Sequence, residues 1–546
     1  MASIDKDNIV YGGPISTSVT SGCKTFAQYF LKELKKNGNK IILTDGLTGK
    51  NISAIELRKK IIRLTYCLEK LGVREGDVVG ICSENRFEFV ITIFSIFCLN
   101  ATAAPLNVTY TERELHHAVN LTKPKLFFVS NIAAERIRNV ARNNEFIKQI
   151  YTFDTTSPYK DIQTFNSLIN NPSTRSYPIY LAKPTNIDEN VILITCSSGT
   201  TGLPKGVQIT QRNLLNTIDR QYDANSYLPS DSKYLSILPW FHAFGCCTLL
   251  GIISSGIHLV YFAKFQEEEF LSAIQKYKIN FVYMVPPLMV FLAKHPLVEK
   301  YDLSSIEALF CGAAPLSRET ENAVYKRCRI PIIRQGYGLS ECTLGVLRQN
   351  ENFCKPGSVG ALKVGHWAKV IDPETGKILG PNQRGELCFK GECIMKGYIG
   401  DQEATKSVLK DGWLHTGDIG YFDNDLEFFI VDRIKELIKY KAFQVPPAEI
   451  ESILLTNPKV KDVGVVGLPD EKSGELPFAF IVKQPNVELN EKEVIDFVAQ
   501  KTSPAKHLRG GVKFIQEIPK NPSGKILRRK LKEMLPNSKS EIKSKL

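Results

Sequence analysis

The sequence contains 13 cysteines and eight histidines but no Cys-x-x-Cys pair and no His-x-x-x-His spacing. Such spacings are typical of redox dithiols and structural zinc sites, so their absence argues against both. The cysteines are scattered and odd in number, and many lie in apolar runs, where a buried, reduced thiol is the expected state. The sequence therefore predicts a protein without disulfides or structural zinc.

Long apolar runs are also missing. The most apolar stretch, residues 89–106, is interrupted by Thr92, Ser95 and Asn100, and it is short for a membrane helix of about 20 residues. We expect a buried helix there and no transmembrane segment. The N-terminus has no apolar segment of the kind found in secretory signal peptides.

The positive charge is not spread as a nucleic-acid surface would require. The net charge is +13, but nine Lys or Arg and only two Glu lie in residues 520–546. No basic stripe with interleaved aromatic residues accompanies this tail. We therefore expect a solvated basic tail and no nucleic-acid partner.

A length of 546 residues exceeds the roughly 250–300 residues at which a single core stops growing, so two or more domains are expected. Helix-like segments at 26–36 and 55–71 alternate with strand-like runs at 77–82 and 125–129. This alternation predicts α/β layers around a largely parallel sheet.

The pattern changes along the second half of the chain. A second set of strands with helical connections spans 235–338, and the glycine-rich residues 357–400 favour a small barrel or sandwich. We predict an α/β protein in which residues 1–432 form layered α/β subdomains plus a small β-barrel. Residues 433–546 are predicted to form a small, mobile α+β C-terminal domain.

A glycine-rich run, Ser197–Gly206, directly follows an apolar β-branched segment. Its glycines allow backbone N–H groups to approach phosphate oxygens, its hydroxyls add donors, and Lys205 supplies a positive charge. It is not a Walker A sequence, because Lys205 precedes Gly206 and the strand-like residues 207–209 follow. The run predicts a phosphate-binding loop, and the alternative is a flexible surface hairpin.

Two further motifs combine glycines with a carboxylate. In residues 336–341, Tyr337 could stack on a base and Glu341 could face Mg²⁺; the alternative is a strand-to-turn junction with a surface Glu. Residues 411–418 end in Asp418, which could accept both hydroxyls of a ribose. The alternative there is a glycine turn with a solvated carboxylate.

Two single residues are ambiguous on their own. Lys525 ends a tight turn, residues 520–525, which by itself would be an exposed basic loop. His242 lies in the aromatic-rich residues 240–245, where a lone histidine is usually a satisfied core residue.

Together and in this order, the motifs resemble the acyl-adenylate-forming superfamily: acyl-CoA synthetases, 4-coumarate–CoA ligases and beetle luciferases. The resemblance covers nearly the whole chain from about Tyr11. It is carried by residues 197–206, 336–341, 413–418, 432–433 and 519–525. Within the superfamily the chain is most similar to insect luciferase-like fatty acyl-CoA synthetases, on the evidence of residues 11–14, 239–245, 438–441 and 544–546.

The resemblance implies ATP or AMP contacts at Ser197, Ser198, Gly199, Thr200, Thr201, Gly202, Lys205, Gly312, Ala313, Ala314, Gln335, Gly336, Tyr337, Gly338, Ser340, Asp418 and Arg433. It implies Glu341 as the Mg²⁺ ligand. The acyl pocket would be lined by His242, Phe244, Gly312, Gly338 and Leu344, and CoA would meet Lys264, Lys441 and Ala442.

The implied catalytic residues are Lys525, His242 and Lys439. Lys525 would act on the carboxylate and α-phosphate in the first half-reaction, in which two anions must be joined. The small domain would then rotate about a hinge near Asp432 and bring the face of Lys439 and Lys441 over the adenylate.

The chain departs from its relatives at three positions. Ala442 stands where relatives usually have glycine, and the added methyl could weaken the thioester-forming state. Leu344 replaces a serine and Phe241 a histidine that are common in beetle luciferases. Both changes make the pocket more apolar, and with Trp240 and Phe244 they favour an alkyl chain.

The leading hypothesis is a fatty acyl-CoA ligase for medium- or long-chain acids that uses ATP, Mg²⁺ and coenzyme A. One alternative is a luciferase that adenylates luciferin and oxidises it with O₂, and another is a non-enzymatic nucleotide- or lipid-binding module. Ser544-Lys545-Leu546 has the form of an address bound by the peroxisomal import receptor, so peroxisomal localisation is expected; a lysine- and serine-rich tail can also end this way by chance.

Overall fold

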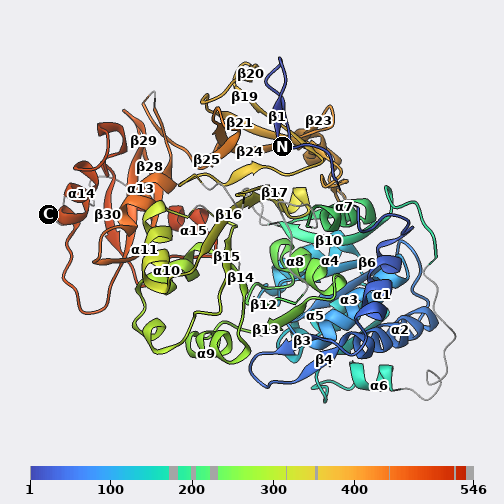
Figure 1. Cartoon of the computed structure of the whole chain (residues 1–546). Coiled ribbons are helices and arrows are strands. Elements are labelled where there is room, and N and C mark those ends of the chain that lie inside the picture. Colours follow the sequence, from blue (N-terminus) through green and yellow to red (C-terminus); the bar gives the residue numbers. More distant parts are fainter. Residues whose placement is uncertain are drawn as a thin grey trace.

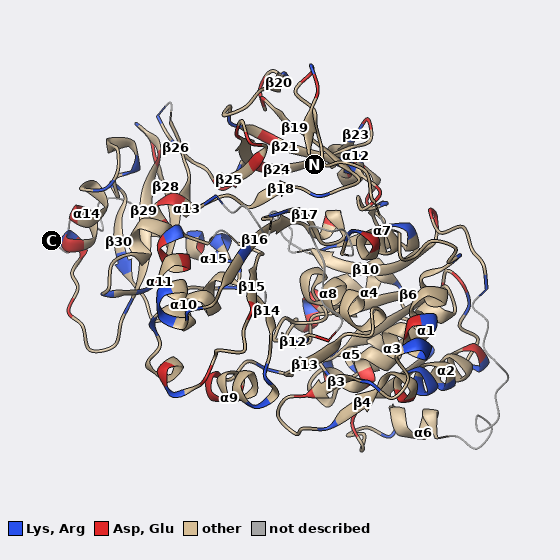
Figure 2. Ribbon diagram, viewed as in Figure 1, with Lys and Arg blue, Asp and Glu red and all other residues tan. Residues whose placement is uncertain are grey.

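The computed structural model describes residues 2–16, 18–170, 183–197, 204–221, 231–314, 316–350, 355–441, 443–521 and 524–536. A large region built from two sheet systems with their helices lies beside a small C-terminal sheet (Figure 1). Basic and acidic residues are interspersed over helices and loops of both parts (Figure 2).

The first sheet has eight strands in the order β22-β11-β10-β6-β5-β7-β8-β9. Its strands are β5 (Val78–Cys82), β6 (Thr102–Leu106), β7 (Leu126–Val129), β8 (Gln149–Thr152), β9 (Gln163–Thr164), β10 (Val191–Ser197), β11 (Lys205–Thr210) and β22 (Gly397–Tyr398). The central strands pair in parallel and are almost fully buried. Such burial requires cover on both faces, which is why these strands are continuous apolar runs.

Helices of the N-terminal half pack on this sheet and on one another. They are α1 (Phe26–Asn37), α2 (Ala54–Lys70), α3 (Phe87–Cys98), α4 (Glu112–Thr122), α5 (Asn131–Arg142), α6 (Phe165–Ile169), α7 (Gln211–Gln221) and α8 (Ala243–Ser254). Both α2 and α4 begin with a capping box, which satisfies N–H groups that a helix start leaves unbonded.

The second system contains six parallel strands in the order β3-β13-β12-β14-β15-β16, with β4 antiparallel to β3. The strands are β3 (Ile41–Asp45), β4 (Asn51–Ser53), β12 (Lys233–Ser236), β13 (His258–Tyr261), β14 (Phe281–Met284), β15 (Ala308–Cys311) and β16 (Ile332–Gly338). Its helices are α9 (Glu267–Tyr277), α10 (Pro286–Lys294), α11 (Arg318–Cys328) and the short 3₁₀ turns η2 (Pro296–Lys300) and η3 (Ser340–Cys342).

An antiparallel layer continues from β16 through β17 and β18 to β25, β24, β21 and β19. Its elements are β1 (Ser3–Ile4), β2 (Val10–Tyr11), β17 (Gly345–Arg348), β18 (Gly360–Leu362), β19 (His366–Ile371), β20 (Ile378–Leu379), β21 (Gly385–Gly391), β23 (Leu409–Lys410), β24 (Trp413–Phe422), β25 (Glu427–Arg433) and α12 (Gln402–Val408). The change from parallel to antiparallel pairing confirms the change of pattern expected after residue 338. Closure into a barrel stays a prediction.

The C-terminal sheet has five strands that pair with one another in a separate sheet. They are β26 (Ile438–Tyr440), β27 (Phe443–Val445), β28 (Val460–Asp470), β29 (Gly474–Lys483) and β30 (Gly511–Phe514), accompanied by α13 (Pro447–Leu455), α14 (Glu491–Ala499), α15 (Arg528–Glu533) and the 3₁₀ turn η4 (Pro504–Lys506). The predicted α+β composition is confirmed. The boundary at 432–433 stays a prediction, although β25 ends there.

The apolar residues 89–106 do not form one helix, so that prediction is wrong in extent. Helix α3 ends at Cys98, Asn100 has a φ of +53°, and β6 begins at Thr102. A left-handed residue cannot continue a right-handed helix, and asparagine adopts this conformation more readily than most residues. None of the described helices is long and apolar enough to cross a membrane.

Candidate active site

A cavity of about 610 Å³, here called the active-site cavity, opens beside β14, β15 and β16. Its wall includes residues from the carboxyl-terminal halves of these strands, the start of α8, strands β17 and β24, and Lys525 from the small domain. Carboxyl ends of neighbouring parallel strands meet at one sheet edge, where ligands bind in open α/β sheets. The sheet thus brings together groups that are distant in sequence.

A second cavity of about 1180 Å³, here called the interdomain cavity, lies between the large region and the small domain. Its wall includes residues of α10 on one side and of α13 on the other. It shares residues 335–338, Arg433 and Lys525 with the active-site cavity. The shared residues are therefore reachable from both sides.

Lys525 and His242 come from different domains and share the active-site cavity. The Lys525 ammonium lies 4.0 Å from Glu436 Oε1, and burial together with Arg433 lowers the pKa of Lys525 to about 8. His242 caps α8, where the Phe244 N–H donates to its Nδ1 at 3.4 Å, so Nε2 carries the proton.

Burial and the charge of Lys525 lower the pKa of His242 to about 4. The ring is therefore a neutral donor near neutral pH, next to an ammonium that is still largely protonated. This pair fits an anionic group, and it excludes the plain core role considered for His242 and the exposed-loop role considered for Lys525.

Asp418 on β24 is held by Tyr337 of β16 and by Arg433 of the adjacent strand β25, and it is 3% exposed. Tyr337 Oη donates to its Oδ2 at 2.6 Å, and Arg433 Nε lies 3.1 Å from its Oδ1. Burial raises the pKa of Asp418 and Arg433 opposes that rise. Among the described residues no hydrogen bond of good geometry reaches Oδ1, so this oxygen can accept a ligand hydroxyl. The solvated-turn alternative is wrong.

Glu341 belongs to a cluster with Tyr398 and Lys205. Tyr398 Oη donates to Glu341 Oε1 at 2.7 Å, and Lys205 Nζ lies 4.8 Å from the Tyr398 ring centroid. All three line the active-site cavity, so Glu341 is not the surface residue of the alternative interpretation. A carboxylate oxygen at such a place has the ligand chemistry that Mg²⁺ prefers.

The predicted adenine wall follows β15 and β16. A Cβ at Gly338 would lie 1.9 Å from Leu344 O, so only glycine fits there. Ala313 has a φ of +73°, an uncommon conformation for a residue with a side chain that clusters at ligand sites. Gln335 is fixed because its Nε2 donates to Glu321 Oε2 at 2.9 Å.

The remaining predicted residues of this wall also lie at the two cavities. Gly312, Ala313, Gly336 and Ser340 line the active-site cavity, and Ala314 lines the interdomain cavity.

The predicted phosphate loop joins β10 to β11, which pair antiparallel with Ser197 opposite Lys205. Both flanking residues line the active-site cavity, as phosphate binding requires. The loop residues Ser198, Gly199, Thr200, Thr201 and Gly202 lie outside the described residues.

Comparison with known proteins decides the family. A family model described as AMP-binding enzyme matches residues 30–399, and one described as AMP-binding enzyme C-terminal domain matches residues 449–525. The chain belongs to the AMP-binding enzyme family. This places it among the acyl-adenylate-forming enzymes, as the motifs indicated.

The relatives of this AMP-binding enzyme are named for two different activities. It is 41% identical to a luciferin 4-monooxygenase of Photuris pensylvanica, over 99% of this chain and 100% of the relative. It is 39% identical to a probable 4-coumarate–CoA ligase of Dictyostelium discoideum, over 94% of this chain and 96% of the relative. A solved anthranilate–CoA ligase with anthranoyl-AMP has the same fold, with a TM-score of 0.86 at 23% identity over 96% of this chain and 98% of that one.

Lys439, expected to be catalytic, and two residues expected to contact CoA, Lys264 and Lys441, lie away from the site in this AMP-binding enzyme. Lys439, Lys441 and Lys264 are exposed and line neither cavity. Lys439 lies on β26, where its backbone N–H donates to Glu475 Oε2 at 2.8 Å. Ala442 lies outside the described residues. The small domain thus presents Lys525 to the cavity and Lys439 to solvent.

Two residues expected to make the acyl pocket apolar are core residues instead. Trp240 is fully buried against Phe89 and Tyr261, with ring centroids 5.7 and 4.9 Å away. Phe241 is 9% exposed and packs in a separate core cluster. Both precede the α8 N-cap and line neither cavity, so their assignment to the pocket was wrong. Phe244 and Leu344 do line the active-site cavity.

Sequence reasoning missed several cavity residues: Tyr283 on β14, Phe310 on β15, Arg334 on β16, Arg348 on β17, and Tyr398 on β22. They belong to no local motif, because each is a single position on a different strand. Only the order and register of the strands bring them together.

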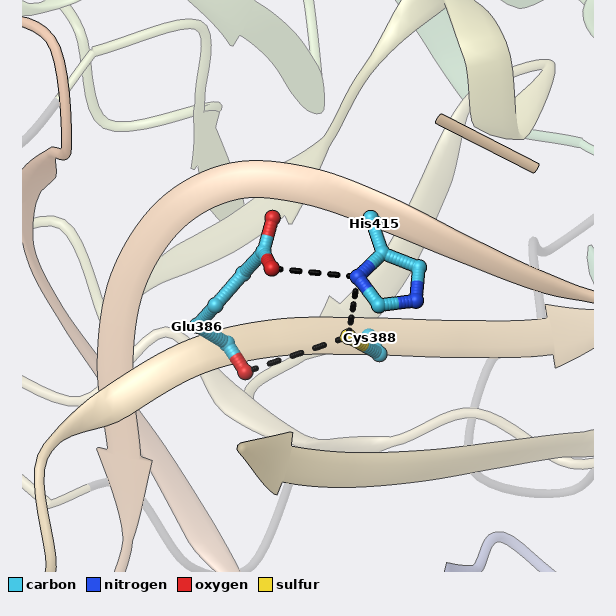
Figure 3. Close-up of side chains that lie close together, drawn as sticks. All are labelled: Glu386, Cys388 and His415. Atoms are coloured by element: carbon cyan, nitrogen blue, oxygen red, sulfur yellow. Dashed lines mark hydrogen bonds and ion pairs between the residues drawn. The ribbon is translucent and has the colours of Figure 1, made fainter. Parts of the chain in front are cut away.

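A cluster of Glu386, Cys388 and His415 (Figure 3) lies beside the part of β24 that precedes Asp418. Glu386 Oε2 lies 3.1 Å from His415 Nδ1, and Glu386 Oε1 accepts from the Gly417 N–H at 2.9 Å. Cys388 lies directly opposite His415 across β21 and β24. The three donor atoms lie within 4.8 Å of one another. No motif in the sequence predicted that these three side chains would lie together. The cluster fixes the residue before Asp418.

Proposed function

We propose that this AMP-binding enzyme is an ATP-dependent ligase that converts a medium- or long-chain fatty acid to its CoA thioester through an acyl-AMP intermediate. The observation that supports this most is the shared cavity of Lys525 and His242, with Asp418 and Arg433 adjoining it. These groups provide cationic and hydrogen-bonding partners for a carboxylate and a nucleotide.

The first half-reaction joins a carboxylate oxygen to the α-phosphorus of ATP, and the bond from that phosphorus to the bridging oxygen breaks to release pyrophosphate. Lys525 offsets the negative charge that develops on the α-phosphate. Neutral His242 donates from Nε2 to the carboxylate, and Asp418 accepts the ribose hydroxyls. Glu341 would hold Mg²⁺, which offsets phosphate charge when bound.

In the second half-reaction the CoA sulfur attacks the acyl carbon, the acyl–oxygen bond to AMP breaks, and the thiol proton passes to solvent. Lys439 and Lys441 face away from the cavity in this structure, so the small domain must move for them to contribute. The interdomain cavity of about 1180 Å³ lies between the two bodies, and interfaces between domains of one chain generally permit relative motion.

The test is release of pyrophosphate that depends on ATP and Mg²⁺, with and without CoA, over a panel of fatty acids, 4-coumarate and luciferin. We expect release with medium- or long-chain acids that rises when CoA is added. Absence of pyrophosphate with every acid would overturn the proposal. Lys439→Met is expected to slow thioester formation about tenfold while leaving single-turnover adenylation intact.

A second candidate function is a luciferase, favoured by the 41% identity to a luciferin 4-monooxygenase. Here the enzyme would adenylate luciferin, and O₂ would oxidise the adenylate with light emission. Pyrophosphate release with luciferin alone, accompanied by light, would place this activity first.

The peroxisome is the proposed location. It rests on Ser544-Lys545-Leu546, which lie outside the described residues. A fluorescent fusion that keeps this C-terminus free should gather in peroxisomes, and deletion of the three residues should disperse it. An unchanged distribution would contradict the proposal.

A further inference from the structure

Helix α10 of the large region faces the small domain across the interdomain cavity (Figure 1). Its first and last residues, Pro286 and Lys294, both line that cavity, and so do Glu451 and Leu455 of α13 on the opposite side. A helix of nine residues is about 13 Å long. The two ends of α10 are therefore far enough apart to make separate contacts with the small domain.

The C-terminal end of α10 bonds to the small domain through Lys294. Its Nζ donates to Leu455 O at 3.2 Å and to Val460 O at 3.3 Å. Leu455 is the last residue of α13, and the carbonyls of a last helical turn have no partner within their own helix. An ammonium there satisfies such a carbonyl and interacts favourably with the negative end of the helix dipole. Lys294 thus joins the two domains directly.

The N-terminal end of α10 meets the turn that carries Lys525. A Cβ at Gly524 would lie 3.3 Å from Pro287 Cγ and 3.3 Å from Val285 Cγ2, so this turn packs closely against the start of the helix. Gly524 has a φ of +79°, a conformation that favours glycine. Lys525 follows directly and lines the active-site cavity. The packing of this turn on α10 therefore accompanies the presence of Lys525 in the cavity.

Two separate contacts on one helix fix the orientation of the small domain better than one contact could. A body held at a single point can still turn about it, and a second point about 13 Å away removes much of that freedom. Leu455 and Val460 belong to the small domain and move with it. A rotation that brings Lys439 to the active-site cavity must therefore break both hydrogen bonds of Lys294.

We propose that Lys294 is a positioning residue that holds the small domain in the adenylating orientation, in which Lys525 lies in the active-site cavity. Lys294 acts through the placement of Lys525 and takes no part in bond making. The inference rests on the proposed ligase function, and it names a contact that sets the balance between the two half-reactions.

The first test measures the two half-reactions separately in Lys294→Met. Single-turnover pyrophosphate release reports adenylation, and conversion of supplied acyl-AMP to thioester reports the second step. Loss of two exposed, charge-assisted hydrogen bonds should shift the domain towards its other orientation and lower the ratio of adenylation to thioester formation about fivefold. Lys294→Arg should keep the wild-type ratio, because a guanidinium can donate to the same carbonyls. An unchanged ratio in Lys294→Met, or an equal fall in Lys294→Arg, would contradict the proposal.

The second test is the rate at which an amine-reactive reagent, acetic anhydride, modifies Lys525, which requires no catalytic activity. The Lys525 side chain is 24% exposed in this structure, so release of the small domain should speed its modification. In Lys294→Met we expect about a threefold rise relative to Lys530, an exposed lysine of the same domain. Equal modification of Lys525 in the wild type and Lys294→Met would overturn the inference.

Lys300→Met is the matched control for both tests. Lys300 is exposed, ends the 3₁₀ turn η2 that follows α10, and lines neither cavity, so its substitution should change neither readout. Thermal unfolding identifies a variant that has not folded. Absence of pyrophosphate with every acid in the wild type would overturn the ligase function, whereas the modification of Lys525 tests the domain contact independently of it.

Discussion

The residues predicted to contact the nucleotide and those predicted to contact the acid are held in different ways. The predicted nucleotide and Mg²⁺ contacts are held by polar side chains, such as Tyr337 and Arg433 on Asp418, and Tyr398 on Glu341. The predicted acid contacts include Phe244, whose ring meets Tyr283, which in turn stacks on Phe310.

The difference shows where shared chemistry and substrate choice reside. The groups predicted to handle ATP would meet a ligand that does not vary between substrates, and they belong to short contiguous motifs. Phe244 and the rings beside it are single positions on separate elements, which can be exchanged without disturbing a turn. Variants in the first group should affect all acids alike, and variants in the second should change the ratio between acids.

The largest effect is expected from Lys525→Met. Loss of the ammonium near the α-phosphate should slow adenylation about a thousandfold for every acid. Conversion of supplied acyl-AMP to thioester should change little, because the proposed mechanism uses Lys525 only in the first half-reaction. Single-turnover pyrophosphate release measures the loss, and Lys530→Met, an exposed lysine on α15, is the control. If the loss differed from one acid to another, the separation of the site residues into nucleotide contacts and acid contacts would be wrong.

A smaller uniform effect is expected from Asp418→Asn. This change removes the charge paired with Arg433 and should weaken ATP binding by about 2 kcal/mol, or roughly thirtyfold. Isothermal titration with ATP measures the change. Asp411→Asn in the same segment is a matched control, because Asp411 is exposed and its φ of +51° suits asparagine. Equal effects of the two substitutions would contradict the assignment of Asp418 to the nucleotide site.

The pH dependence sharpens the assignment of Lys525. Its pKa is lowered to about 8 by burial and Arg433, and the protonated form is the one that offsets phosphate charge. We therefore expect kcat/KM for adenylation to fall as pH rises through about 8. His242, with a pKa of about 4, stays neutral over this range. Lys525→Arg should move the fall to higher pH; an unchanged profile would assign it to another group.

The smallest effect is expected from Leu344→Ser, at a predicted acid contact. A hydroxyl at this position offers one hydrogen bond to a polar heterocycle, worth about 1 kcal/mol or about fivefold in luciferin turnover. Light output per enzyme measures it, and ATP binding serves as the internal control because Leu344 is not among the predicted nucleotide contacts. No rise in light would show that residue 344 does not contact the acid.

Much of the fold could be predicted because segments with a clear local sequence pattern form the helix or strand that this pattern indicates. The helix predicted at 26–36 is α1 (Phe26–Asn37), and the strand predicted at 125–129 is β7 (Leu126–Val129). The run 89–106 was misjudged because α3 and β6 are both almost fully buried, and periodicity cannot separate a buried helix from a buried strand. Trp240 and Phe241 were wrongly assigned to the acyl pocket because aromatic character does not indicate whether a side chain beside a helix N-cap points into the core or into the cavity.

The sequence by itself determined the family and the polar groups that are predicted to face ATP, since Lys205, Glu341, Asp418 and Lys525 each belong to a contiguous motif. Only the tertiary structure decided that the small domain presents Lys525 and turns Lys439 outward. It also decided the part of the active-site cavity wall where Tyr283, Phe310, Arg334 and Arg348 meet through strand pairing. Parallel neighbours are joined by whole helices, so residues that touch across these strands carry no signature in the chain.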